Sequence, residues 1–177
     1  MSFFYQTEAD RPKLYSNLVS ACESGWDFSS RWFARDGKNS LTLDTIETMS
    51  IIPVDLNSIL CKNEWILKEF YSIIGNKIKS SYYYAKYQDR KKAIQAVLYN
   101  TESGIWHDYS LKTNQSRSYF YMSNIFPVFM ECAELTEEKQ NQILQYLVKN
   151  GVPNFKGGVP TSLDDTGQQW DFPNAWS

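Results

Sequence analysis

Two stretches of the 177-residue sequence combine acidic, amide and indole side chains in patterns that could support chemistry on a sugar. Residues 23–32 hold two carboxyl groups, one arginine and two tryptophans. Residues 157–176 contain three glycines and a Gln-Gln-Trp-Asp run. Glutamine amides both donate and accept hydrogen bonds, as sugar hydroxyls require, and the flat apolar face of an indole suits a pyranose ring. These two stretches are therefore the candidates for a functional site.

Asp27 is the candidate general acid in the first stretch. A carboxyl group between the indoles of Trp26 and Trp32 would be poorly solvated, which favours its neutral form and raises its pKa. A general acid in glycoside hydrolysis needs such a pKa, because it must carry a proton near neutral pH. The residues alone favour a simpler interpretation, in which Asp27 caps a turn and its carboxylate pairs with Arg31.

The second stretch also has a structural interpretation. Trp170 and Trp176 could be core residues of a final helix, with Asp171 as its cap and Pro173 in its first turn. From the residues alone, the choice between a sugar-binding wall and a packed helix stays open.

The composition excludes one class of partner. Lys and Arg number 18 against 20 Asp and Glu, so the formal net charge is −2, and nothing resembles the basic footprint of a nucleic-acid-binding protein. The aromatic content of 16% fits either a large aromatic core or a carbohydrate site. No segment approaches the ~18 apolar residues of a transmembrane helix.

The cysteines and the N-terminus carry little information. Cys22, Cys61 and Cys132 show no CxxC spacing, so we expect small buried side chains and neither a disulfide framework nor a zinc site. One N-glycosylation triplet, residues 114–116, would matter only in a secreted chain. The first eight residues do not form a signal peptide, so the chain is either intracellular or lacks its true beginning. Localisation is left unassigned.

The elements that must position these residues are helices. An apolar stripe predicts a first helix ending near Gly25, directly before the candidate acid. A second helix is expected from Asp55 to Gly75, a third over about residues 78–99, and a fourth after Thr136. The expected apolar side of the first helix consists of Leu14, Tyr15, Leu18, Val19 and Cys22. That of the third helix consists of Tyr82, Ala85, Ala93 and Val97. That of the fourth helix consists of Ile143, Leu144, Leu147 and Val148.

Between the helices lie long segments, including the aromatic stretches 105–109 and 118–122, which could be hairpins or irregular loops. Loops of such length are usually functional or disordered, and their composition is not that of disorder. We interpret them as ordered walls of a site in a mainly α-helical chain.

The residues also carry a resemblance. The run Gln169–Ser177 closely resembles one of the two signature motifs of trehalases, glycoside hydrolase family 37, and residues 23–32 are similar to the segment that bears their catalytic acid. Three further stretches match in the same order: residues 53–57, 104–109 and 123–127. The resemblance begins around Asp10, so residues 1–177 are interpreted as part of a trehalase catalytic domain.

This resemblance implies an all-α fold, roughly half of an (α/α)6 toroid, with long ordered loops forming the site. The implied reaction is inverting hydrolysis of the small molecule trehalose to two glucoses, with Asp27 as the general acid. The Gly25 backbone would contact the sugar, Trp170 would wall the site and Gln169 would bond a hydroxyl. No metal and no organic cofactor is implied. The lone histidine, His107, replaces a common aromatic residue and is expected to be a surface or packing substitution.

An inverting glycosidase also needs a carboxylate base, ~6.5–9.5 Å from the acid. In trehalases this base lies downstream of the motif at which this sequence ends, and neither that segment nor the upstream signature occurs here. Asp171, Glu23 and Glu64 give no convincing substitute, since Asp171 is expected to cap a helix and Glu64 to be solvated. The sequence therefore predicts a chain that is inactive by itself. The alternatives are a non-catalytic sugar-binding or regulatory fragment, an incomplete sequence of an ordinary trehalase, and another (α/α)6 glycosidase.

Overall fold

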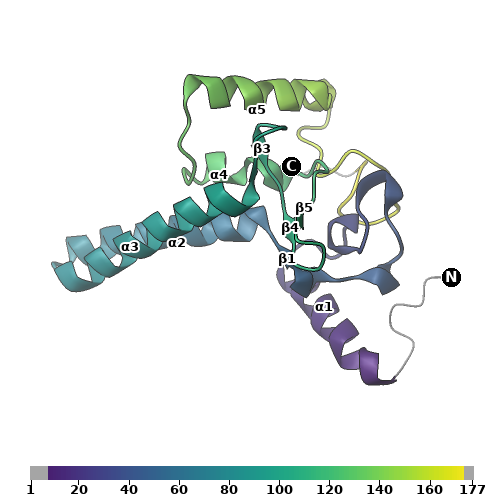
Figure 1. The fold of residues 1–177 in the computed structure, drawn as a ribbon, viewed down its shortest axis with the longest axis horizontal. Coiled ribbons are helices and arrows are strands. Elements are labelled where there is room, and N and C mark those ends of the chain that lie inside the picture. The colour runs from purple at the N-terminus through teal and green to yellow at the C-terminus, as the bar shows by residue number, and fades with distance from the viewer. Residues whose placement is uncertain (1–7, 174–177) are drawn as a thin grey trace. The chain divides into compact units, whose positions relative to one another are not determined.

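The computed structural model describes residues 8–173, which divide into two compact units. Of the described residues, the first unit comprises 8–52, 109–122 and 147–173, and the second comprises Pro53–Asp108 and Ser123–Tyr146. The α-helices of the described part are α1 (Arg11–Glu23), α2 (Val54–Ile73), α3 (Lys77–Ala93), α4 (Phe126–Phe129) and α5 (Glu137–Lys149) (Figure 1). The prediction of a mainly helical chain is confirmed. Within residues 8–173, none of these helices has the length and apolar character needed to cross a membrane.

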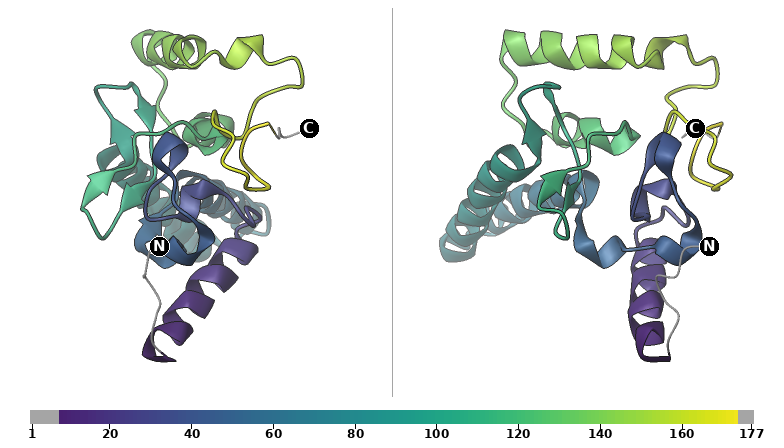
Figure 2. Two further views of the ribbon diagram at one scale, coloured as in Figure 1. Left: turned by 90° about the vertical axis from the view of Figure 1, so that its right-hand side faces the viewer. Right: turned by 45° about the vertical axis from the view of Figure 1, so that its right-hand side comes forward.

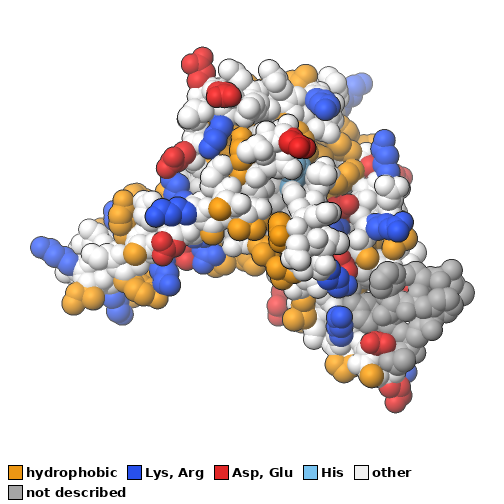
Figure 3. All heavy atoms as spheres, in the orientation of Figure 1, with side chains coloured by type: hydrophobic (Ala, Val, Ile, Leu, Met, Phe, Trp, Pro, Cys, Tyr) orange, Lys and Arg blue, Asp and Glu red, His pale blue; other side chains and the backbone are white. Residues whose placement is uncertain are grey.

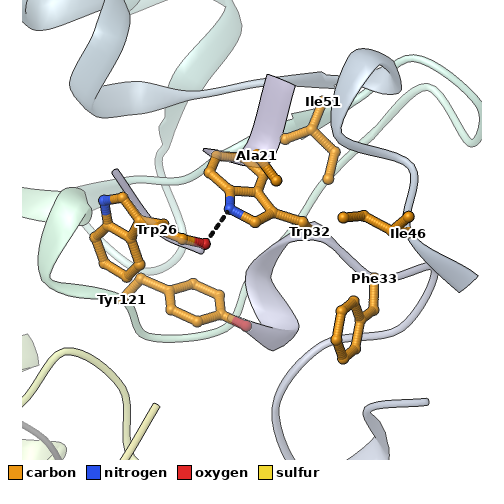
Figure 4. Close-up of a cluster of buried hydrophobic side chains, with 7 residues drawn as sticks. All are labelled: Ala21, Trp26, Trp32, Phe33, Ile46, Ile51 and Tyr121. Carbon is orange, nitrogen blue, oxygen red and sulfur yellow. Dashed lines mark hydrogen bonds between the residues drawn. The ribbon is translucent and has the colours of Figure 1, made fainter. Parts of the chain in front are cut away.

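The first unit contains α1 and a small antiparallel sheet of strand order β1-β4-β5. Its strands are β1 (Ile51–Ile52), β4 (Tyr109–Ser110) and β5 (Gln115–Ser116). Two-residue strands are too short to bury a face, so the core of this unit comes from the end of α1 and the loops around it. Figure 4 shows the cluster, which comprises Ala21, Trp26, Trp32, Phe33, Ile46, Ile51 and Tyr121.

The second unit is built on the helical hairpin of α2 and α3, which lie side by side (Figures 1 and 2). Gly75 follows α2 with a φ of +76°, and the Asn76 side chain accepts the Lys79 N–H at 3.1 Å to cap α3. Arg90 on α3 donates two hydrogen bonds, of 2.9 and 2.8 Å, to Glu64 on α2. The expectation of a solvated Glu64 is therefore wrong, because the facing helix supplies a bidentate cation.

A short π-helical turn, Ile94–Leu98, leads from α3 into the hairpin of β2 (Tyr99–Asn100) and β3 (Ile105–Trp106). Gly104 makes the turn of this hairpin with a φ of +70°, and a Cβ there would come within 2.7 Å of Gln142 on α5. The aromatic stretch 105–109 thus contributes to β3 of one sheet and β4 of another, whereas residues 118–121 form no strand.

The cysteines differ from expectation. Cys61 on α2 and Cys132 after α4 form a disulfide with Cα atoms 6.3 Å apart, and both are buried. Cys22 is a free, exposed thiol. The prediction of three buried thiols is wrong, because the bonded cysteines are separated by 71 positions and local sequence patterns do not indicate that they are close in space.

The helix positions agree with the sequence, but several expected buried sides do not. On α3 no residue is buried, and Tyr82 is 55% exposed. On α5 only Ile143 is buried, while Leu144 and Val148 are exposed. On α1, Leu14 and Leu18 pack against the core as expected, but Tyr15, Val19 and Cys22 are exposed.

Apolar side chains are consequently left on the surface of the helical hairpin, where they gather in Figure 3. The most exposed are Phe70, Ile73, Ile74 and Ile78 at its tip. Amphipathic helices that expose an apolar face are typical of elements whose packing partner lies outside the segment in view.

Candidate active site

The candidate acid follows directly on the end of α1. Ser24 caps the helix, and its hydroxyl donates to the Ala21 carbonyl at 2.6 Å and accepts the Trp26 N–H at 3.1 Å. Gly25 has a φ of +77°, a conformation that glycine adopts without strain, and a Cβ there would meet no atom within 4 Å. The position therefore favours glycine for its backbone conformation and not for lack of space. This turn sends Trp26 into the core and leaves the next residue outside.

The two indoles of this stretch enclose an arginine. The Arg31 guanidinium carbon lies 4.7 Å from the Trp26 ring centroid and 4.5 Å from that of Trp32, and all three side chains are buried. Trp32 Nε1 donates to the Trp26 carbonyl at 3.1 Å (Figure 4). Such cation–π contacts stabilise a desolvated guanidinium. The two indoles therefore pack in the core and against the Arg31 guanidinium.

Asp27 itself is exposed, and it takes part in none of the ion pairs between described residues. Both expectations for its surroundings are therefore wrong. It is not shielded between indoles, because Arg31 occupies that space, and it does not pair with Arg31. The peptide bond that follows it, Asp27–Phe28, is cis.

The second candidate stretch meets the first through a backbone hydrogen bond. The Trp170 N–H donates to the Phe28 carbonyl at 3.0 Å, although the two residues are 142 positions apart in the sequence. Trp170 is half-buried and packs with Phe28 against the cluster of Figure 4, while Gln169 is exposed. Asp27 and Gln169 each precede a partner of this hydrogen bond by one residue. The structure thus brings three of the four candidate site residues into one small region, with Gly25 two positions earlier.

Asp171 holds this junction together. Its carboxylate is fully buried and accepts the Ser29 hydroxyl at 2.6 Å, the Ser30 N–H at 3.0 Å and the Thr166 hydroxyl. Ser29 in turn accepts the Arg31 N–H at 3.1 Å at the start of a 3-10 turn. The final helix that Asp171 was expected to cap would extend over residues 174–177, which lie outside the described residues, and residues 169–173 are turns and bends. Its role is to join two distant segments.

A layer of tyrosines lies behind the junction and was not anticipated. The Tyr121 hydroxyl is 3.1 Å from Ser30 Oγ, and burial, with the negative charges of Asp36 and Asp171, raises the pKa of Tyr121 well above its ordinary value. The Tyr119 hydroxyl donates to Asp164 at 2.5 Å. Burial is the main cause that raises the pKa of Tyr119, and this hydrogen bond to Asp164 is the next largest. The aromatic stretch 118–122 was the available signal, but its spacing does not tell which rings contact the junction.

His107 is a packing residue, which is one of the two roles expected from the sequence, a surface or a packing substitution. It is fully buried in the second unit, with Nε2 2.9 Å from Ser103 Oγ and Nδ1 3.3 Å from Asn124 Nδ2. Its ring makes an edge contact with Tyr146, and burial raises the pKa of that tyrosine to about 12. The imidazole is therefore an interior side chain whose two ring nitrogens both lie within hydrogen-bonding distance of neighbouring residues.

The comparisons with known proteins bear on the same segments. A sequence model of the trehalase family matches residues 3–177, which is nearly the whole chain. The chain belongs to the trehalase family. It is 44% identical to a trehalase of Apis mellifera over 97% of its own length, 41% identical to a human trehalase over 96%, and 36% identical to a periplasmic trehalase of Salmonella dublin over 97%.

In the same comparisons, the chain spans less than a third of each relative: 28% of the bee protein and 29% of the human and bacterial ones. The fold is similar to that of a neutral trehalase from Saccharomyces cerevisiae, with a TM-score of 0.71, 19% identity, and coverage of 96% of this chain and 31% of that one. The expected fold class, a helical part of an (α/α)6 toroid, is thereby confirmed.

Proposed function

We propose that residues 1–177 form part of a trehalase catalytic domain, which hydrolyses the α,α-1,1-glycosidic bond of trehalose to two glucoses. The observation that carries this proposal is the family match over residues 3–177. The junction of the two candidate stretches supports it, because a carboxyl group, an amide and an indole come together there from distant parts of the sequence.

Asp27 is proposed as the general acid that protonates the glycosidic oxygen of trehalose as the bond breaks. Its exposure leaves the carboxyl group accessible to a ligand, and the Phe28–Trp170 hydrogen bond fixes the chain beside it. Half-buried Trp170 is proposed to wall the sugar site, exposed Gln169 to bond a hydroxyl, and the Gly25 backbone to contact the sugar.

The second half of an inverting reaction is a carboxylate that activates water on the opposite face of the sugar. Asp171 is unsuited to this role, because it is fully buried and both of its oxygens accept hydrogen bonds. Glu64 is engaged by Arg90 in the other unit. We therefore propose that the 177-residue chain by itself does not hydrolyse trehalose at an appreciable rate.

A chimera tests the general acid. Residues 3–177 replace the matching segment of the bee trehalase, and glucose release from trehalose is measured. The chimera is expected to be active, and Asp27→Asn to lower kcat by about 10²–10⁴-fold, since that is the usual contribution of general acid catalysis. Glu23→Gln, an exposed carboxyl group four residues away, is the matched control and should keep full activity. An Asp27→Asn chimera that cleaves trehalose normally would overturn the assignment.

The chain alone tests the remaining claim. We expect no glucose release from trehalose, and turnover abolished by Asp27→Asn would refute the proposed inactivity. Titration calorimetry with trehalose addresses the second candidate function, a sugar-binding or regulatory fragment. Binding without hydrolysis, weakened by Trp170→Ala, would favour that alternative.

A further inference from the structure

The sequence contains a single Asn-x-Ser/Thr triplet, Asn114-Gln115-Ser116. In the structure this triplet lies at the end of the β4–β5 hairpin, where Gln115 pairs with Ser110. Asn114 is the last residue of the turn and is exposed, with a φ of +52°. Asparagine adopts this left-handed conformation more readily than other residues with a side chain.

The surroundings of the turn leave the Asn114 amide accessible. The Leu111 N–H donates to the Ser50 carbonyl at 2.8 Å, and the Lys112 ammonium pairs with Glu47, so the first half of the turn is fixed to the unit. Among residues 8–173, no described hydrogen bond involves the Asn114 side chain. A large group on Nδ2 would therefore extend into solvent without displacing a contact.

A separate observation concerns the compartment. Cys61 and Cys132 are joined by a buried disulfide in the second unit. Disulfides form and persist in oxidising compartments such as the endoplasmic reticulum and the cell exterior, and they are rare in the cytosol. The endoplasmic reticulum is also where Asn-x-Ser/Thr triplets are glycosylated, so the disulfide and the triplet point to the same route.

We propose that Asn114 carries an N-linked oligosaccharide. In the transfer, Asn114 Nδ2 forms a bond to C1 of the first N-acetylglucosamine of a lipid-diphosphate-linked oligosaccharide. The bond from C1 to the phosphate oxygen breaks, the lipid diphosphate leaves with the bonding electron pair, and Nδ2 loses one proton. The Ser116 hydroxyl completes the triplet that the transferase recognises. This site is independent of the proposed sugar hydrolysis.

The test is expression of the full chain behind a cleavable secretory leader in a eukaryotic host. Intact mass spectrometry is expected to show one N-linked oligosaccharide, which peptide N-glycosidase removes to leave aspartate at position 114. Asn114→Gln and Ser116→Ala should each abolish the modification, whereas Ser116→Thr should retain it. An unmodified parent chain, or a glycan that persists in Asn114→Gln, would overturn the proposal.

Two further measurements on the same samples make the outcome independent of secretion and report the state of the cysteines. The oligosaccharide is attached in the endoplasmic reticulum, so a variant that fails to leave the cell can be scored in the lysate by its sensitivity to the same glycosidase. Peptide mapping without reduction gives the state of the cysteines in the same samples. A Cys61–Cys132 linked peptide is expected, and free thiols at both positions would overturn the compartment argument.

Discussion

At the scale of single residues, the junction of the two candidate stretches depends on one buried carboxylate. A buried charge is tolerated where hydrogen bonds replace the lost water, and Asp171 accepts them from Ser29, Ser30 and Thr166. Two of these donors follow Asp27 by two and three residues. The position of the candidate acid is therefore set by a residue that never touches it.

Removal of this carboxylate should weaken the first unit. Asp171→Ala leaves the buried Ser30 N–H without its acceptor, and the expected loss is about 2–4 kcal/mol of the free energy of unfolding, because hydrogen bonds to a charged group are worth about 1.5–3 kcal/mol each. Urea unfolding followed by circular dichroism measures it. Glu23→Gln, which changes an exposed carboxyl group in the same unit, should alter stability by less than about 0.5 kcal/mol. Equal stability of the two variants would contradict the anchoring role.

The buried tyrosines predict a loss of stability at alkaline pH. The pKa of Tyr121 is raised in the folded chain, first by burial and then by the charges of Asp36 and Asp171. A raised pKa means that the folded state keeps a proton which the unfolded state releases above about pH 10. The free energy of unfolding should therefore be constant below that pH and fall above it, by about 1.4 kcal/mol per pH unit for each such proton.

Unfolding midpoints in urea between pH 8 and pH 12 measure this loss. In Tyr121→Phe the decline above about pH 10 should be shallower, although the variant is less stable at neutral pH because Ser30 Oγ loses its partner. An exposed tyrosine provides the control, since Tyr15→Phe should leave the slope unchanged. A decline as steep in Tyr121→Phe as in the parent would exclude Tyr121 as a source.

At the scale of elements, cross-links join the helices of the second unit, whose buried apolar residues include Ile94, Leu98, Ile105 and Trp106. The α2–α3 hairpin carries the bidentate Glu64–Arg90 pair, and α2 is joined to the chain after α4 by the Cys61–Cys132 disulfide. No residue of α3 is buried, so burial of apolar area gives this helix little support. The hydrogen bonds between α3 and α2 therefore contribute more to the stability of α3.

Loss of the disulfide should lower the free energy of unfolding of this unit. Cys132→Ser opens a loop of 71 residues, and the expected cost is about 2–4 kcal/mol, mainly because the unfolded chain becomes less constrained. Thermal unfolding under non-reducing conditions measures it. Cys22→Ser removes an exposed free thiol and should leave the midpoint unchanged. If dithiothreitol lowers the midpoint of the parent but not of Cys132→Ser, the effect belongs to the disulfide.

At the scale of the molecule, the exposed apolar side chains are what a part of a larger helical toroid would show. Phe70, Ile73, Ile74 and Ile78 are all at least 60% exposed at one end of the hairpin. The chain spans less than a third of its relatives, and a toroid encloses the inner faces of its helices with further helices. Such a surface favours association when no partner covers it.

The purified chain is therefore expected to self-associate. Sedimentation velocity over a range of protein concentrations should show species larger than the 20.6 kDa chain. Ile73→Lys with Ile78→Lys, both strongly exposed, should shift the distribution toward monomer without loss of helical content. The pair Gln88→Lys and Asp89→Lys adds the same kind of charge away from the hairpin tip and should have a weaker effect. A monomeric parent chain at all concentrations would contradict the expectation.

The sequence by itself determined the helices and the family. Apolar periodicity, Gly25, Gly75 and the cap at Thr136 located the helix ends, because helix boundaries depend on interactions among residues close in sequence. The residues of the two motif stretches indicate the trehalase family, and the family match over residues 3–177 confirms it. The same motifs are the basis for proposing Asp27, Gln169 and Trp170 as site residues.

Only the tertiary structure decided what surrounds those residues. The Arg31 guanidinium between Trp26 and Trp32 is a local contact, but the residue types alone did not tell whether Arg31 or Asp27 lies between the indoles. The role of Asp171 as an anchor follows from contacts between segments about 140 residues apart. The Cys61–Cys132 disulfide is of the same kind. Solvent exposure and hydrogen-bond partners depend on which distant segments meet. Local patterns of residue types do not specify those tertiary contacts, since many arrangements of helices satisfy the same helical periodicity.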